Sequence, residues 1–262
     1  MPPGLKVTRA WVWAGGCLGA LLALGFWAPA HWLAAAVSEV SQTQVTLLNP
    51  RGTVWDGTAQ LALTGGSGST DTVALPGLVE WKIRPAWGKL HLSVLATCCT
   101  PAPLQLEVQA RGLRSATLSV IDQQSAWPSS LLVGLGTPWN TLQLQGQLLV
   151  RTTGLSIDFG PETTAVAGRL QLDANQVSSR LSTIKPMGSY RLSVVGGITP
   201  SLQLETLEGS LELSGVGQWV NSRLRFDGSA TAQADRIEAL SNLLNIIGRR
   251  NGAQSVIQLG SR

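Results

Sequence analysis

The sequence predicts a mainly β protein with a single N-terminal transmembrane helix, followed by a long antiparallel β-meander that is curved or sandwich-like. Three observations predict this fold. No charged residue lies between Arg9 and Glu39, apolar and polar residues alternate through the rest of the chain, and only 13% of the 262 residues are charged while 29 are glycine. Beyond residue 38, 17 basic residues face 15 acidic ones, because Lys6 and Arg9 account for two of the 19. This balance argues against binding to nucleic-acid phosphates.

The N-terminal segment has the length and flanks of a membrane anchor. Residues 1–9 are expected in the cytoplasm, because Lys6 and Arg9 are the only charges before the apolar run and positive charge stays inside. Residues 10–33 form the expected transmembrane anchor, since about 20 apolar residues cross the hydrocarbon core as a helix. Tryptophans suited to the two membrane interfaces flank the run; they are Trp11, Trp13, Trp27 and Trp32.

A cleaved signal peptide is the alternative for this segment. Ala28-Pro29-Ala30 has the small-residue spacing of a cleavage site, and Ala34–Ala36 offers a second one. The apolar run is longer than the usual h-region of about 7–15 residues, and tryptophans flank it. A retained anchor is therefore favoured, and either alternative places the rest of the chain outside the cytoplasm.

Residues 34–44 are expected to form a short helical or extended tether, and residues 45–262 a single β-rich domain. Alternation of period two is clear in 60–63, 89–94, 104–108 and 142–145, where Leu and Val alternate with Gln, Ser, Glu or Lys. This pattern is typical of antiparallel strands with one covered face. The Gly- and Ser-rich stretch 65–70 is expected to be a flexible hairpin loop.

A weak repeat runs through the second half of the domain. A glycine followed by alternating apolar residues recurs at Gly146, Gly168, Gly188, Gly209 and Gly228, with spacings of 22, 20, 21 and 19 residues. About twenty residues fit two strands of about eight with short turns, so each unit is interpreted as one up-and-down hairpin. The glycines are expected at bulges or tight turns.

Two segments interrupt the β pattern. Residues 127–132 predict a short helix with Pro128 in its first turn, ended by Gly134 and Gly136. Residues 235–248 predict a second helix that packs on the sheet, with Asp235 and Glu238 as a capping box. Its apolar face consists of Ile237, Leu240, Leu243, Leu244 and Ile247. A partner-binding groove helix is the alternative, and a last strand is expected at 256–259.

Cys98 and Cys99 are adjacent and precede Thr100-Pro101. An oxidising compartment permits a disulfide, but neighbouring side chains of a strand point to opposite faces, so a vicinal bond needs a turn. A vicinal or intermolecular disulfide and two reduced structural thiols both stay open. Cys17 lies inside the expected span.

The sequence offers little chemistry for catalysis. The two histidines, His31 and His91, have no Cys or carboxylate at metal-ligand spacing, and no nucleophile-elbow, P-loop or zincin motif is present. The 15 carboxylates fall mostly at alternating strand positions or in turns, as on a solvated sheet face. We therefore expect no enzyme activity, no metal and no cofactor.

Several segments resemble one family. They are Val54–Gly57, Val79–Ile83, Tyr190–Leu192, Gly209–Trp219, Arg223–Ala232 and Ala239–Gly252. With the N-terminal anchor, they resemble the type II secretion system protein N family over nearly the whole chain. The resemblance implies a single-pass protein of the bacterial inner membrane, with its bulk in the periplasm, that contacts other secretion-system components during export of folded proteins. It brings no cofactor or enzymatic activity.

Trp55, Trp81 and Trp219 are candidates for a contact surface, because tryptophan is enriched at the centres of interfaces. The alternative is that they fill the core. A different function also stays open, since glycine-led hairpins with one Leu- and Val-rich face behind an anchor resemble AsmA-like and bridge-like lipid-transfer proteins. That resemblance implies a β-groove that binds or transfers lipid.

Overall fold

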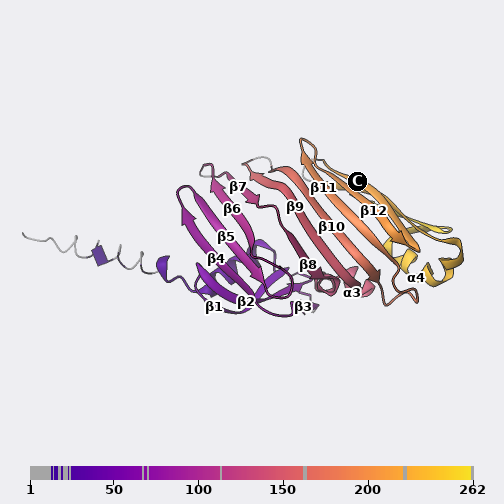
Figure 1. Ribbon diagram of the computed structural model, residues 1–262, viewed down its shortest axis with the longest axis horizontal. Coiled ribbons are helices and arrows are strands. Elements are labelled where there is room, and N and C mark those ends of the chain that lie inside the picture. Colours follow the sequence, from indigo (N-terminus) through magenta and orange to yellow (C-terminus); the bar gives the residue numbers. More distant parts are fainter. Residues whose placement is uncertain are drawn as a thin grey trace, which may run out of the picture.

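The computed structural model describes residues 13, 15–16, 19, 23, 25–66, 68–69, 71–112, 114–161, 164–220 and 223–260. They form one antiparallel sheet of 16 strands, ordered β1-β2-β4-β5-β6-β7-β9-β10-β11-β12-β13-β14-β16-β15, with β3 paired to β2 and β8 paired to β9 beside this order. Figure 1 shows the strands side by side almost in chain order, with α3 and α4 along one border of a long, twisted sheet. The sheet is open, because β1 and β15 end this order and do not pair with each other.

The strands have the following bounds: β1 Val45–Gly52, β2 Asp56–Thr64, β3 Thr72–Ala74, β4 Val79–Ala86, β5 Lys89–Ala96, β6 Leu104–Ala110, β7 Ala116–Val120, β8 Gln124–Pro128, β9 Gln145–Phe159, β10 Thr164–Ser178, β11 Gly188–Gly197, β12 Ser201–Gly209, β13 Leu211–Val220, β14 Arg223–Ala232, β15 Arg249–Asn251 and β16 Gln254–Leu259. The helices are α2 Ala30–Val40, α3 Trp139–Leu142 and α4 Ile237–Ile247, with 3₁₀ turns η1 Ser129–Leu135 and η2 Ala234–Arg236.

The predicted antiparallel meander is confirmed, as a single open sheet and not as a sandwich. The interpretation of a glycine repeat as a hairpin holds for the unit that begins at Gly188, which supplies the paired strands β11 and β12. It is wrong for the units at Gly146 and Gly168, because β9 and β10 are each 15 residues long. Gly168 does mark a bulge: its φ is +81°, and the register of β10 and β9 shifts between Ala167 and Arg169.

Both predicted helical segments are present. The first was expected over 127–132 with Pro128 in its first turn, but Trp127 and Pro128 end β8, and the helical residues are the 3₁₀ turn η1, Ser129–Leu135. In the second, Leu240, Leu243 and Leu244 are buried in α4, as the helical spacing predicts. The capping box is wrong. Asp235 lies in η2 and pairs with Arg236 at 3.0 Å, so α4 begins without a side-chain cap.

One face of the sheet, here called the apolar face, carries Trp81, Val94, Leu106, Leu170 and Leu192 with the aliphatic residues in line with them. Helices cover parts of it: α2 lies against β1 and β2, η1 against β2, β3 and β9, and α4 against β14–β16. Three apolar clusters result, and the largest lies under α4 around Tyr190 and Met187. Between the covered parts, aliphatic side chains stay half-buried.

The outer strands of the sheet are protected against pairing with another chain. In β1, Asn49 has a positive φ of 51°, the register shifts between Leu48 and Arg51, and Pro50 offers no N–H. The Ser41 hydroxyl accepts a hydrogen bond from Val45 N and donates one to Val45 O. At the other end, β15 is three residues long and begins with two exposed arginines.

The expected anchor falls largely outside the described residues. Within the part of the chain that the structure describes, no helix has both the length and the apolar character needed to cross a bilayer. The expected tether, 34–44, is occupied by the second half of α2 and the turn that leads into β1.

Candidate functional site

The turn between β1 and β2 folds around its own threonine. Thr53 N donates to Asp56 O at 2.8 Å, and Asp56 N donates back to the Thr53 hydroxyl oxygen at 3.1 Å. A threonine that bonds the backbone in this way stabilises a tight turn. The Val54–Gly57 segment, which the family resemblance singled out, is therefore held in one conformation.

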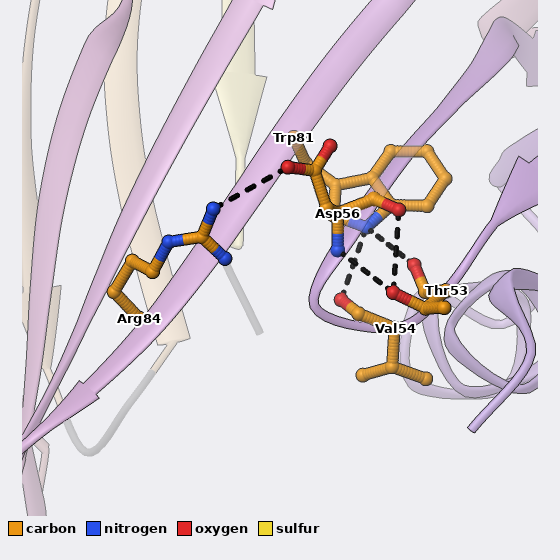
Figure 2. A network of polar contacts seen from close by, with 5 residues as sticks. All are labelled: Thr53, Val54, Asp56, Trp81 and Arg84. Carbon is orange, nitrogen blue, oxygen red and sulfur yellow. Dashed lines mark hydrogen bonds and ion pairs between the residues drawn. The ribbon is translucent and has the colours of Figure 1, made fainter. Parts of the chain in front are cut away.

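Trp81 of β4 lies directly beneath this turn. Its side chain is buried, and its indole N–H donates to Val54 O at 3.0 Å and to Thr53 O at 3.3 Å (Figure 2). A Cβ on Gly57 would lie 2.5 Å from Trp81 Cζ2 and 2.6 Å from Arg51 O, closer than side chains approach. Glycine at position 57 therefore makes room for the indole, which gives the Trp-Asp-Gly sequence a packing reason.

The same turn binds the chain that precedes α2. The indole N–H of Trp55 donates to Gly25 O at 2.7 Å, and Val54 N donates to Ala28 O at 2.8 Å. Pro29 forms a bridge with Thr53. The last carbonyls of a helix lack partners within the helix, so these donors from the sheet cap the N-terminal helical segment. We call Gly25–Pro29 together with Thr53–Gly57 the junction.

The predicted tryptophans fall into separate places. Trp13, Trp27 and Trp32 are exposed, and Trp11 lies outside the described residues. Trp55 and Trp81 meet at the junction, where Trp55 is half-buried and Trp81 belongs to the interior. Trp219 is half-buried on β13, opposite Leu224 of β14, far along the sheet. Whether Trp55 and Trp219 contact a partner stays a prediction.

An ion pair on the opposite, polar face was not predicted. Arg191 Nε donates to Asp173 Oδ1 at 2.7 Å and Arg191 Nη2 to Asp173 Oδ2 at 3.0 Å, from residues opposite each other in β11 and β10. The hydrogen bond from Arg191 holds the pKa of Asp173 below its ordinary value, and Gln171 adds to this effect. Only strand register could have revealed the pair, because its members are 18 residues apart.

Tyr190, beside this pair in sequence, points to the apolar face. Its hydroxyl donates to Leu211 O at 3.1 Å, and burial raises the pKa of the phenol. The side chain is therefore neutral and structural, and it ties β11 to the start of β13.

Cys98 and Cys99 form a vicinal disulfide in the turn after β5, with sulfurs 2.06 Å apart. Cys99 is buried against Leu75 and Leu131, whereas Cys98 is exposed. The turn is also held without the sulfurs, because the buried Thr100 hydroxyl bonds both N and O of Ala96. This turn and β8 line an open pocket of about 480 Å³, and Ala126 N of β8 donates to Cys99 O at 2.8 Å.

The arrangement offers few groups for chemistry. Across the described ranges, no three His, Cys, Asp or Glu residues come together in a way that could hold a metal ion. The described titratable groups with shifted pKa values are the Asp173–Arg191 pair and Tyr190, and all three are engaged in structural hydrogen bonds. What the molecule presents is surface: a junction with the N-terminal segment, a partly uncovered apolar face and a polar face.

Comparison with known proteins agrees with the resemblance seen in the sequence. The family model described as type II secretion system (T2SS), protein N, matches residues 43–258. Comparisons with curated proteins and with solved structures find no match. The matched range includes every strand except the last residue of β16, Leu259. The chain therefore belongs to the type II secretion system protein N family, and is a type II secretion component.

Proposed function

We propose that this protein is anchored in the bacterial inner membrane by residues 10–33, and that its β-domain works in the periplasm through contacts with other secretion components. The observation that carries the proposal is the family match over residues 43–258. The scarcity of reactive groups among the described residues is consistent with a role in protein contact.

The C-terminal third is the favoured contact region. Leu207, Val216 and Leu259 are exposed there, at 43%, 65% and 55%. Val216 lies on the polar face, in line with Gln203 and Asp227, whereas Leu259 lies opposite Phe226 on the other face, so Val216 is an exposed apolar side chain that the polar face offers to a partner. Because Val216 lies opposite Asp227 and beside glycines at 215 and 217, its side chain stands clear of its neighbours.

The test is crosslinking in intact cells. A photo-reactive amino acid at Val216 is expected to give an adduct with a secretion component, whereas the same group at the exposed Leu90, near the other end of the sheet, is expected to give none. Deletion of the gene is expected to lower export of type II substrates. Unchanged export, with no secretion component captured at either position, would contradict the proposal.

Lipid binding is a second candidate, favoured by the half-buried aliphatic residues of the apolar face. Leu106, Leu170, Val194 and Leu202 lie between the parts that helices cover, and these half-buried Leu and Val side chains suit an acyl chain. The test is phospholipid content after mild detergent extraction. Val194→Asp is expected to lose bound lipid, and Ser193→Asp, on the polar face next to it, to keep it. A lipid-free wild-type protein would remove this candidate.

A further inference from the structure

The junction fixes where the sheet begins relative to the end of the N-terminal helical segment. Trp55 and Val54 bind carbonyls only three residues apart, at Gly25 and Ala28, and Pro29 bridges to Thr53. No free linker therefore separates this segment from the sheet. The turn is held by direct hydrogen bonds to Gly25 and Ala28, near the C-terminal end of the expected anchor.

We propose that the Thr53–Asp56 turn rests on the bilayer surface, and that Lys82 and Arg84 beside it bind the phosphates of phospholipid headgroups. This proposal rests on the membrane anchor of the proposed function. It adds a second membrane contact, made by the β-domain itself, which sets the orientation of the sheet.

The aromatic residues around the junction fit a position at the bilayer surface. Phe26 and Trp27 are exposed at 72% and 76%, and Trp32 at the start of α2 is exposed at 50%. Tryptophan side chains prefer the headgroup level, where an apolar ring and a polar N–H are both accommodated. The Trp55 indole is bonded to Gly25 O, and Gly25 is only two residues before Trp27 in the chain. We therefore expect Trp55 and Trp27 to lie at the same depth in the headgroup layer.

The charges of the turn fit headgroups. Lys82 is opposite Asp56 across β2 and β4, and Arg84 follows on the same polar face, where it pairs with Asp56 at 3.4 Å. The Arg84 and Asp56 side chains are 62% and 53% exposed, so this pair is weak and can exchange for another partner. Among the described residues, Lys82 makes no ion pair. Figure 2 shows Arg84 reaching from its strand toward the turn.

Further charges on the polar face lie beside Thr58, two residues along β2 from Asp56. Arg51 and Glu80 both flank Thr58, Arg51 from β1 and Glu80 from β4. They offset each other, so the cations nearest the turn decide its net charge. Phosphate oxygens form charge-assisted hydrogen bonds with lysine and arginine, and the ammonium of phosphatidylethanolamine can meet Asp56. A phospholipid headgroup therefore matches both signs of charge at the turn.

The first test measures how close position 82 lies to the lipid headgroups. It uses the full chain with Cys17→Ser and an intact Cys98–Cys99 disulfide, so that the introduced cysteine carries the label. An environment-sensitive fluorophore is attached at Lys82→Cys or at Lys185→Cys, an exposed lysine in the distant loop before β11. The protein is reconstituted in vesicles of phosphatidylethanolamine and phosphatidylglycerol that contain headgroup-nitroxide lipid. Quenching is expected to be several-fold stronger at position 82 than at 185. Equal quenching would overturn the proposal.

A second test isolates the charges. The rise in thermal midpoint on moving from phosphatidylcholine to phosphatidylglycerol vesicles is expected to disappear in K82Q/R84Q and to persist in the matched variant R223Q/R225Q. The same rise in both would overturn the headgroup contact. Flotation after alkaline carbonate separates the two proposals. A protein that floats while position 82 is not quenched keeps its anchor and lacks this contact, whereas a protein that does not float loses both.

Discussion

The two ends of the sheet are each covered by a helix of eleven residues, and the two helices are held differently. At the C-terminal end, α4 buries Leu240, Leu243 and Leu244 almost completely. At the N-terminal end, α2 buries only Ala30, and the chain just before it is bound through backbone carbonyls and an indole N–H. Apolar packing thus stabilises one end, while directional hydrogen bonds position the other.

The difference suggests distinct roles. A helix that is held by buried apolar surface contributes mainly to stability, because the free energy gained from apolar burial is large and does not depend on direction. A segment held by a few hydrogen bonds gains little stability, since each is worth only about 0.5–1.5 kcal/mol net, but its geometry is defined. The C-terminal end is therefore expected to contribute more to the free energy of unfolding. The N-terminal end is expected to fix the orientation of the N-terminal segment relative to the sheet.

Truncation of Leu244 should give the largest effect. Leu244→Ala removes a fully buried side chain under α4 and is expected to lower the free energy of unfolding by about 2–5 kcal/mol. Val40→Ala, on the exposed side of α2, is the matched control and is expected to change it by less than about 0.5 kcal/mol. Urea unfolding of the full chain in detergent measures both. Equal losses would erase the contrast between the two helices.

Gly57→Ala should come next. The new methyl group would collide with Trp81 and with Arg51 O, so we expect a loss of about 1–3 kcal/mol from forced repacking. At Gly112, an added Cβ meets only the Ser115 hydroxyl at 3.0 Å, and Gly112→Ala serves as the control. The same unfolding assay applies. A Gly57→Ala protein as stable as the control would show that the junction tolerates movement of the indole.

Trp55→Phe is expected to have a smaller effect on stability, about 0.5–1.5 kcal/mol, because it removes one N–H donor and keeps most of the ring. Faster hydrogen exchange at the Val54 amide, which binds Ala28 O, would report loosening of the junction. Trp87→Phe is the control, since Trp87 is fully exposed in the β4–β5 turn. Unchanged exchange in Trp55→Phe would mean that the backbone contacts alone hold the junction.

The smallest effect is expected in the pH dependence of stability, and it comes from the Asp173–Arg191 pair in the middle of the sheet. Arg191 lowers the pKa of Asp173 below its ordinary value of 3.8, so the pair stabilises the fold above that value. This stabilisation is lost as the pH falls through the lowered pKa. Asp173→Asn should therefore flatten the acid limb of the stability curve between about pH 5 and 2. A curve parallel to that of the wild type would show that the pair does not contribute.

Local periodicity was sufficient to predict the strands and the buried face of α4. The alternation in 89–94 became β5, and the spacing of Leu240, Leu243 and Leu244 gave the buried side of the helix. The hairpin interpretation held for the unit that begins at Gly188 and failed for those at Gly146 and Gly168, because a twenty-residue period fits one long strand as well as two short ones. The capping box failed because Asp235 was drawn into a 3₁₀ turn that no local rule distinguishes from an N-cap.

The candidate site was less accessible from sequence. Trp81 reaches Val54 across 27 residues and Trp55 reaches Gly25 across 30, so both contacts depend on register and on where the N-terminal segment docks. The Val54–Gly57 segment was noticed through the resemblance alone. Its physical reason, a glycine that makes room for an indole, appears only when β2 and β4 are paired.

The order of the strands has a consequence for how the protein is made. Nearly every strand pairs with the one that precedes it in the chain, and even β8 and β3 join strands next to them in sequence. A polypeptide whose N-terminal part is made first can therefore add strand after strand to the sheet, because each new strand pairs with one that is already formed. Short loop closures favour fast folding, and little unpaired backbone waits for a distant partner.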